Sequence, residues 1–391
     1  MTPSENPSAQ VQRKPNFENL RRTLLRQGPP GPVPFAELFA DPGTMESVLG
    51  EKFPLDLRGL VLSSDGEPAA PAESSMDRLL KAKQVVDMIL RFCYETGYDY
   101  VYMYPGIEFP RSNYLVTGDT ASQKNWSAGK RIWQDEETGP IQNWADFEAY
   151  PWPTPQTVSY TGIQYLNTVM PEGMKICVDL PGILENSTWL MGFQSFSYAL
   201  FDQPDLIKAI VQKVADVVIA AAAHAATFEN VGMFFLGDDM GFYSGTLVSP
   251  KVLRDYIFPY HRKLVETVHA HDKPILLHSC GNLEKVMDDI IDVGFDAKHS
   301  FEDKIMPVEE VYRRWGDRIA IIGGVDMDIL ARGSEEDVRR RTRQILEVCG
   351  ANGTGYCLGT GNTVANYVPK ENYLAMLDEG RKWDREHFGT E

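Results

Sequence analysis

One apolar run ends in an imidazole and a thiol that stand two residues apart. The run occupies residues 275–277, and His278 and Cys280 follow it. Imidazole nitrogen and thiolate sulfur are ligands that Zn²⁺ prefers in proteins. The alternative is a hydrogen-bonded core histidine beside an inert thiol. A further thiol, Cys357, lies at the end of another apolar run, so three ligands could converge on one metal ion.

Two adjacent carboxylates, Asp238 and Asp239, follow the apolar run 231–237. Such a pair is costly to bury without a partner cation, so either residue could close a metal site or act as a general acid or base. They could equally cap a loop. Glu185 follows another apolar run, and it could complete the metal site or cap the helix after it.

Strand-like and helix-like patterns alternate about eight times, which is typical of a parallel sheet covered by helices. The strand-like runs are continuously apolar and occupy residues 31–39, 98–106, 175–182, 231–239, 274–281, 295–303, 318–326 and 355–361. Helical patterns occupy residues 76–97, 186–201, 204–226, 249–271, 283–294, a segment from Pro307, 334–350 and 369–383. The number of units favours a single (β/α)₈ barrel of the TIM type over an open doubly wound sheet.

The active sites of such barrels lie at the C-terminal ends of the strands, where this chain places many polar residues. We therefore predict a site with catalytic, metal-binding and substrate-binding residues. The catalytic candidates are Asp238 and Asp239, the metal ligands are His278, Cys280 and Cys357, and the substrate-binding candidates are Glu37, Asp179, Glu185, His299 and Asp326.

The sequence pattern predicts one domain with two irregular parts. Residues 1–30 are polar and rich in proline, and we expect a disordered or extended leader followed by a barrel over residues 31–391. Residues 110–160 are rich in Trp, Gly and Pro with weak periodicity. They form an excursion that is either a lid over the site or a small satellite core under a long loop.

Composition excludes several classes of function. The 391 residues carry a formal net charge of −17, which disfavours nucleic acid and anionic membrane surfaces as partners. The sequence contains no apolar run long enough for a transmembrane helix and no secretory h-region at its start. The 5 cysteines are odd in number and widely spaced, which argues against a disulfide framework and favours the cytoplasm. Neither a dinucleotide-binding nor a P-loop motif occurs.

Four segments resemble the uroporphyrinogen decarboxylase superfamily over about residues 170–385: LVSPKVLRDYIFPYHRKLVETVHAHDKPILLHSCGN, GFDAKHSFED, GDRIAIIGGVD and YVPKENYLAMLDEG. The resemblance implies a (β/α)₈ barrel. Its decarboxylases are metal-free and hold substrate carboxylates with an arginine-rich motif, where this chain has VPFAELFAD without arginine. Its other branch comprises zinc methyltransferases that work with corrinoid proteins. That branch implies His278 and Cys280 as zinc ligands and Cys357 as the third.

The third ligand departs from the family pattern. Alignment of LGTG (358–361) with the glycine-rich turn of the family puts Thr360 at the ligand position, three residues beyond Cys357. An odd offset along a strand points a side chain to the opposite face. Asp238, Asp239 or Glu185 could therefore complete the site in place of Cys357.

The expected function is zinc-dependent methyl transfer between a small methylated substrate and a corrinoid on a partner protein. The aromatic excursion favours an O-methyl substrate such as an aromatic methyl ether. The expected partners are a corrinoid carrier protein and the small methyl donor or acceptor, and a homodimer is allowed. The alternatives are a metal-free decarboxylase of a smaller carboxylated substrate, with Asp238 or Asp239 as the acid, and a binding or chaperone module.

Overall fold

Seven parallel strands form one curled sheet in a TIM-like α/β fold, which confirms the predicted fold class. The computed structural model describes residues 14–55, 75–111, 114–118, 130–134 and 137–389. The strands follow one another in space as in sequence: β1 (Tyr100–Met103), β4 (Lys175–Pro181), β5 (Val231–Gly237), β8 (Ile275–His278), β9 (Ala297–His299), β10 (Ala320–Ile322) and β11 (Tyr356–Cys357). Their central residues are buried on both faces, as their continuous apolar runs predict.

The eighth strand position holds an isolated bridge in place of the strand predicted over residues 31–39. Phe35 pairs in parallel with Leu358, and Leu358 N–H donates to the Pro34 carbonyl at 2.8 Å. Pro32 and Pro34 have no amide hydrogen, so this segment cannot extend a regular ladder. The segment instead contacts the far edge of the sheet through the Glu37 N–H, which donates to the Tyr100 hydroxyl at 2.8 Å.

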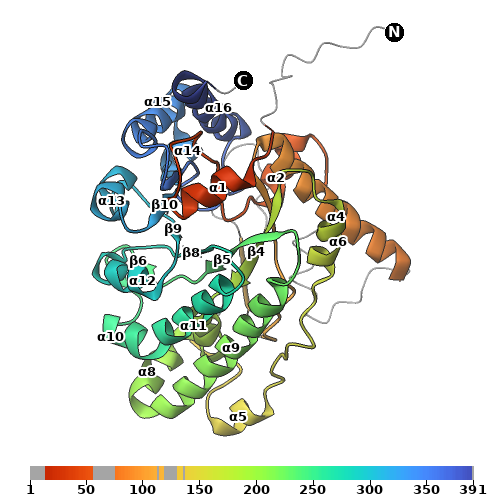
Figure 1. Cartoon of the computed structure of the whole chain (residues 1–391). Helices are drawn as coiled ribbons and strands as arrows, with labels where there is room; N and C mark the ends of the chain where they lie inside the picture. Colours follow the sequence, from red (N-terminus) through yellow and green to blue (C-terminus); the bar gives the residue numbers. More distant parts are fainter. Residues whose placement is uncertain (1–13, 56–74, 112–113, 119–129, 135–136, 390–391) are drawn as a thin grey trace.

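Helices cover the outside of the sheet (Figure 1). Between successive strands and after the last one lie α6 (Thr161–Val169), α7 (Ile183–Met191), α8 (Phe193–Asp202), α9 (Pro204–Ala225), α10 (Pro250–Val252), η1 (Leu253–Ile257), α11 (Phe258–His269), η2 (Glu284–Val286), α12 (Met287–Val293), α13 (Val308–Trp315), α14 (Met327–Arg332), α15 (Glu335–Ile345), η3 (Leu346–Gly350) and α16 (Lys370–Phe388). The predicted start at residue 249 is confirmed, because the Ser249 side chain accepts from Val252 N–H and Pro250 is the first helical residue.

The predicted leader is wrong for residues 17–24, which form helix α1 (Phe17–Leu24). Phe17, Leu20 and Leu24 are spaced by three and four residues, so they share one helix face, and that face is buried. Helix α1 packs beside β11, and α2 (Pro42–Leu49) and α4 (Ser75–Thr96) follow before β1. Residues 1–13 of the predicted leader lie outside the described residues.

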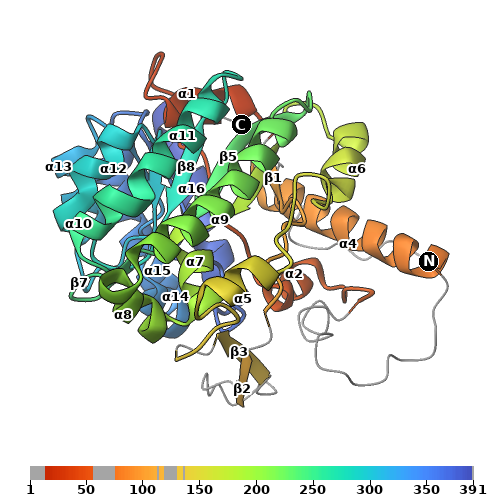
Figure 2. The same ribbon diagram turned by 90° about the horizontal axis from the view of Figure 1, so that it is seen from below.

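The predicted excursion over residues 110–160 contains regular structure. Strands β2 (Tyr114–Gly118) and β3 (Lys130–Gln134) form an antiparallel hairpin, and helix α5 (Trp144–Ala149) follows. The rings of Phe147, Tyr150 and Trp152 pack together with centroid separations of 5.3 and 4.7 Å. This small aromatic cluster supports the satellite-core interpretation for the part around α5. The hairpin, α5 and α8 lie at one end of the molecule, and α1 lies at the other (Figure 2).

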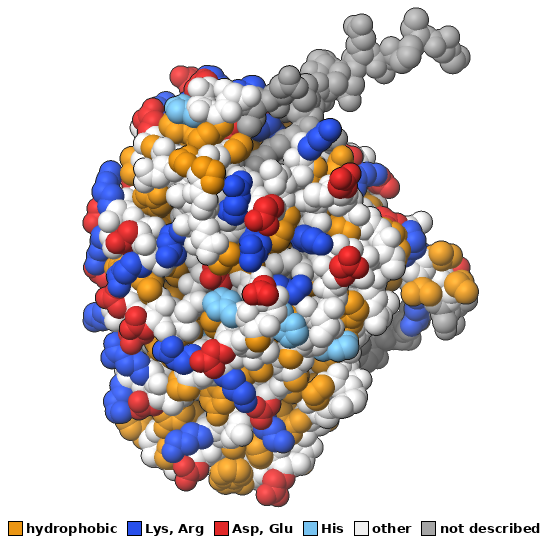
Figure 3. Space-filling model, in the orientation of Figure 1, with side chains coloured by type: hydrophobic (Ala, Val, Ile, Leu, Met, Phe, Trp, Pro, Cys, Tyr) orange, Lys and Arg blue, Asp and Glu red, His pale blue; other side chains and the backbone are white. Residues whose placement is uncertain are grey.

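Within the described ranges, no helix is both long and apolar enough to cross a lipid bilayer. Acidic and basic side chains are interspersed over the face seen in Figure 3.

Candidate metal centre

Three potential ligands meet where β5 and β8 end side by side. Gly237 pairs with His278, and Asp238 N–H donates to the His278 carbonyl at 2.9 Å. The two segments that follow these strands therefore begin side by side. The Cys280 N–H donates to Asp239 Oδ1 at 2.7 Å. One ligand atom from each of Asp239, His278 and Cys280 lies within 4.8 Å of the other two. Strand pairing therefore assembles an oxygen, a nitrogen and a sulfur at the mouth of the barrel.

Hydrogen bonds behind the centre fix the tautomer of His278. His299 Nε2 lies 3.1 Å from the Thr360 carbonyl, which can only accept, so this nitrogen carries a proton. Burial lowers the pKa of His278 to about 3 and that of His299 well below its usual value, so both rings are neutral. His299 Nδ1 then accepts from His278 Nδ1–H across 2.9 Å. The lone pair of His278 Nε2 is left for a metal ion.

The Cys280 thiol faces hydrogen-bond donors and an acidic neighbour. Burial raises its pKa to about 12, with a further contribution from Asp239. Asn362 Nδ2 lies 3.4 Å from the sulfur and Ser300 Oγ lies 3.7 Å from it, and both can donate to a thiolate. A divalent cation reverses this preference for the protonated form, because metal binding releases the thiol proton.

The donor set fits Zn²⁺. His278 Nε2 lies 3.4 Å from Cys280 Sγ and 3.7 Å from Asp239 Oδ1, so the three atoms converge before any ion is bound. One nitrogen, one thiolate and one carboxylate oxygen are all zinc ligands, and three protein ligands leave a position for substrate, as catalytic zinc sites do. The Asp239 side chain is 37% exposed, which keeps the centre open toward the mouth.

Glu185 adds a second carboxylate beside this centre. It lies in the first turn of α7, and its pKa is raised well above the usual value by burial and then by Asp239 and Asp238. Burial also raises the pKa of Asp239. Glu185 therefore holds its proton more tightly than an isolated glutamate does.

Asp238 has a structural position and does not join the metal centre. Its Oδ2 accepts from Ile183 N–H and Leu184 N–H at 3.0 and 3.1 Å, and its Oδ1 accepts from Glu185 N–H at 3.0 Å. His261 Nε2 lies 2.8 Å from Oδ2, and Asp238 is completely buried. The carboxylate therefore caps the free amides of α7. The structure therefore brings Asp238 to these amides and not into the cluster of Asp239, His278 and Cys280.

Cys357 also lies outside the cluster, so the structure does not bring its sulfur together with Asp239, His278 and Cys280. It pairs with Ile322 in the sheet, and its side chain belongs to the completely buried hydrophobic core. Asp239 takes the third position instead. Thr360, three residues farther along the chain, does not join the cluster either, because its hydroxyl lies 2.7 Å from Glu37 Oε2.

The remaining predicted substrate-binding residues have different surroundings. Asp326 caps α14 and accepts from Asp328 N–H and Asp303 N–H, which is a structural role. His299 is completely buried behind His278, where it can position the ligand but cannot reach a substrate. Asp179 is half-buried at the end of β4, and burial raises its pKa to about 7. Asp179 therefore remains a proposed substrate contact.

Glu37 is buried beneath Thr360, and its ionisation is linked to folding. Burial raises its pKa from 4.5 to about 8, although Thr360 N–H and Oγ1–H both donate to the carboxylate. Because the folded state binds this proton more tightly, the contribution to stability is complete below pH 4.5 and is lost as pH rises through about 8.

We therefore expect Glu37→Gln to flatten the pH dependence of stability. The free energy of unfolding of the wild type should fall, relative to the variant, across the interval from 4.5 to about 8 that separates the two pKa values. Urea unfolding at several pH values measures this difference. Parallel curves for the two proteins would show that Glu37 does not titrate in this range.

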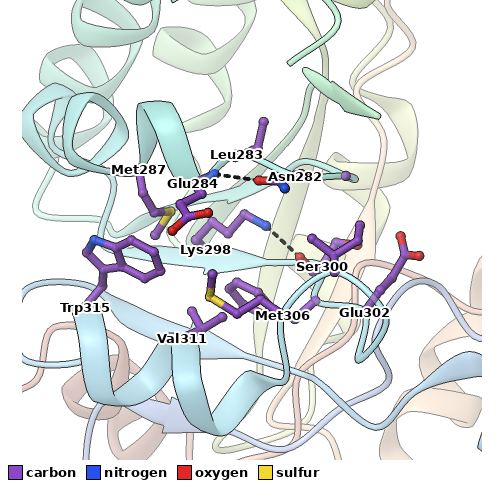
Figure 4. A pocket seen from close by; sticks show the side chains of 13 residues that line it. Asn282, Leu283, Glu284, Met287, Lys298, Ser300, Glu302, Met306, Val311 and Trp315 are labelled. Carbon is purple, nitrogen blue, oxygen red and sulfur yellow. Dashed lines mark hydrogen bonds between the residues drawn. The ribbon is translucent and has the colours of Figure 1, made fainter. Parts of the chain in front are cut away.

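Sequence reasoning missed two residues near the centre, Asn362 and Lys298. Asn362 follows the glycine-rich turn and contacts the Cys280 sulfur. Lys298 lies inside β9 and lines a pocket next to Cys280 (Figure 4). The signal for it in the sequence was a lysine inside the short strand predicted around FDAKHSF.

A parallel α/β barrel with a cluster of metal-binding side chains at the strand ends is the architecture of a large class of enzymes. A model of the uroporphyrinogen decarboxylase (URO-D) family matches residues 136–383, and the chain belongs to this family. The chain is similar to a solved structure, a methyltransferase from Methanosarcina mazei, with a TM-score of 0.67 and 16% identity over 95% of this chain and 99% of that one. That likeness concerns the fold.

Curated relatives of two kinds match part of the chain. A methylated-thiol–coenzyme M methyltransferase of Methanosarcina mazei is 29% identical over 175 residues, 44% of either chain. A uroporphyrinogen decarboxylase of Dechloromonas aromatica is 25% identical over 191 residues, 48% of this chain and 51% of that one. The methylcobamide:CoM methyltransferase MtaA of Methanosarcina barkeri is 24% identical over 189 residues, 48% and 52%. The chain thus spans about half the length of these relatives.

Proposed function

We propose that this protein is a zinc-dependent methyltransferase that moves a methyl group between a small substrate and a corrinoid carried by a partner protein. The observation that carries the proposal is the convergence of Asp239, His278 and Cys280, with the His278 lone pair directed by His299. The similarity to relatives named as coenzyme M methyltransferases supports it. The substrate is a thiol or a methyl ether, and the relative named as a methylated-thiol–coenzyme M methyltransferase favours the thiol.

The residues of the proposed centre have different roles. His278, Cys280 and Asp239 would hold the ion, and Asn362 donates to the sulfur of Cys280. A zinc ion at this position supplies Lewis acidity to a substrate oxygen or sulfur. Transfer from a methyl ether to a Co(I) corrinoid gives an alcohol and a methylated corrinoid and consumes one proton. Glu185, whose pKa is raised by burial and by Asp239, would supply this proton, and it would take a proton back when a thiol is methylated.

An aromatic hairpin beside the centre offers a surface to the partner. Strands β6 (Gly241–Phe242) and β7 (Gly245–Thr246) follow Asp239, and Asn282 N–H donates to the Phe242 carbonyl at 2.7 Å. Phe242 and Tyr243 are 58% and 68% exposed. Apolar side chains at the mouth suit a carrier protein that must bring its cofactor close to the metal centre.

The test is zinc content followed by methyl transfer in both directions. Purified protein should hold about one zinc per chain, as three convergent ligands predict. With methylcobalamin and a panel of small thiols, the visible spectrum should change to that of Co(I) cobalamin; with Co(I) cobalamin and aromatic methyl ethers, it should change in reverse. Protein that neither contains nor takes up zinc would refute the proposal. Release of CO₂ from a carboxylated substrate would then favour the metal-free decarboxylase, and no turnover at all would favour a binding or chaperone module.

A further inference from the structure

Glu37 lies where the barrel closes, between the last strand β11 and the first strand β1. The Ala36 N–H donates to the Leu358 carbonyl at 2.9 Å, and the Glu37 N–H donates to the Tyr100 hydroxyl at 2.8 Å. Only 3% of Glu37 is exposed, and its carboxyl group contacts the glycine-rich turn, residues 359–362, that follows β11. The main chain of Glu37 is therefore held on both sides, and its side chain is directed at this turn.

The glycine-rich turn lies between Glu37 and the proposed metal centre. On one side, the Thr360 N–H donates to Glu37 Oε1 at 2.6 Å. On the other side, the Thr360 carbonyl accepts from His299 Nε2–H at 3.1 Å, and Asn362 Nδ2 lies 3.4 Å from Cys280 Sγ. Through His299 and Asn362, this one turn supports two of the three candidate ligands.

The Thr360 hydroxyl connects the carboxyl group of Glu37 with the main chain of Asn362. Its oxygen lies 2.7 Å from Glu37 Oε2 and is also hydrogen-bonded to the Asn362 carbonyl. A hydroxyl has one proton, and a carbonyl can only accept. If Glu37 is a carboxylic acid, it donates to Thr360 Oγ1, and the hydroxyl proton remains for the Asn362 carbonyl. If Glu37 is ionised, the hydroxyl donates to the carboxylate instead, and the Asn362 carbonyl loses this donor.

The surroundings of Glu37 favour the carboxylic acid. Among the described residues, the titratable groups that face its carboxyl group are the phenols of Tyr98, Tyr100 and Tyr373, and the Cys93 thiol lines the same small cavity. Burial raises the pKa of each of these four groups, so all of them are neutral at neutral pH. Burial also raises the pKa of Glu37 to about 8, which agrees with the hydrogen-bond pattern.

We propose that Glu37 is a positioning residue whose carboxylic acid group anchors the glycine-rich turn and thereby holds the metal centre in its binding geometry. This inference rests on the proposed zinc site. Glu37 contributes no ligand atom and acts through Thr360. The Thr360 carbonyl fixes His299 behind the imidazole ligand, and the Thr360 hydroxyl fixes Asn362 beside the thiolate ligand.

The test combines two substitutions of Glu37 with a matched control in the same region. Glu37→Met removes the hydrogen bonds and keeps an unbranched side chain, whereas Glu37→Gln keeps an acceptor for Thr360 N–H and a donor for Thr360 Oγ1. Asp384→Leu is the control, because Asp384 is also buried and accepts from Val33 N–H at 2.8 Å in the same N-terminal segment. Zinc affinity is measured by competition with a chelator, and circular dichroism shows whether each variant folds.

Glu37→Met should bind zinc about 10-fold more weakly than the wild type, at the lower end of what partners behind metal ligands contribute. Glu37→Gln should restore the wild-type affinity, and Asp384→Leu should lose stability but keep the affinity. In zinc-free protein, nitrogen NMR should show single tautomers of His278 and His299 in the wild type and mixtures in Glu37→Met. Loss of stability alone would not change these tautomers.

A second pair of variants keeps the test decisive if Glu37→Met does not fold. Thr360→Val removes the hydroxyl and keeps the main-chain N–H and carbonyl, so it should weaken zinc binding without mixing the tautomers of His299. Thr360→Ser restores the hydroxyl and should restore the affinity. Equal affinities in the two Thr360 variants would show that the hydroxyl does not act on the metal centre.

The wild type and Glu37→Gln together give a pH profile. The amide cannot ionise, and proton competition at the metal ligands is the same in both proteins, so the ratio of their zinc affinities reports Glu37. The wild type should match the variant well below the Glu37 pKa of about 8. Above it, the wild type should bind zinc up to about 10-fold more weakly, because the ionised group withdraws the Thr360 hydroxyl from Asn362.

Several results would overturn the inference. Wild-type zinc affinity in a folded Glu37→Met protein would deny any coupling to the metal centre. Equal losses in Glu37→Met and Glu37→Gln would exclude the hydrogen bonds as the cause, and an equal loss in Asp384→Leu would assign the effect to stability. If the wild type binds no zinc, the proposed function fails, and the tautomers decide this inference separately: single tautomers in Glu37→Met would overturn it, and mixtures would retain the positioning role.

Discussion

Replacing Cys280 by serine is expected to abolish stoichiometric zinc binding and, with it, methyl transfer. Cys280 supplies the sulfur of the three-atom cluster, and a serine hydroxyl is a much poorer ligand for zinc than a thiolate. The loss in affinity should exceed the ~10–100-fold that a partner outside the ligand set costs. Elemental analysis after dialysis measures it directly.

The matched control for this experiment is Cys357→Ala. Cys357 lies in the hydrophobic core outside the cluster, so this variant should retain about one zinc per chain even if its stability falls. A Cys357→Ala protein that loses its zinc while Cys280→Ser keeps it would reverse the ligand assignment. Circular dichroism of both variants separates loss of metal from loss of fold.

Replacing His299 by leucine is expected to weaken zinc binding about 10–100-fold, although His299 contributes no atom to the cluster. The substitution removes the acceptor for His278 Nδ1–H, so the His278 ring is free to rotate and to exchange tautomers. His299→Gln retains one acceptor and one donor and should fall between the wild type and the leucine variant. Chelator competition measures all three proteins.

The tautomer itself can be observed in the zinc-free wild type. Nitrogen NMR of labelled histidine should show His278 with a protonated Nδ1 and a bare Nε2, and His299 with the proton on Nε2. A proton on Nε2 of His278 would contradict the hydrogen-bond chain from His299 to the Thr360 carbonyl. That result would leave the zinc prediction to rest on Cys280 and Asp239 alone.

Sequence periodicity predicted the sheet because buried parallel strands are apolar throughout, and that pattern is local. The segment around Phe35 was predicted as a full strand because its side chains are suitable, but its prolines cannot supply the ladder hydrogen bonds. Helix α1 was missed because eight residues with Phe17, Leu20 and Leu24 on one face carry little signal within a polar, proline-rich stretch.

Part of the site was also predictable, because it too depends on a local pattern in the sequence. The spacing of His278 and Cys280 is a local signal, and the structure brings both into the cluster. Asp238 and Asp239 are indistinguishable in sequence, since only the turn after β5 decides which carboxylate meets the amides of α7 and which meets Cys280. The hydrogen bonds of His299 and the burial of Lys298 depend on neighbours far along the chain, so no local pattern reports them.

The placement of the three candidate ligands at the ends of two adjacent strands has a consequence for how such a protein can diversify. All three lie between residues 239 and 280, and the described residues that follow β1, β4, β10 and β11 supply no atom of the cluster. Those segments can change length and composition under selection while the metal-binding unit is inherited intact. One ancestral centre can thus acquire new substrates by exchange of its surrounding loops, and grafting such loops between relatives is a practical route to altered specificity.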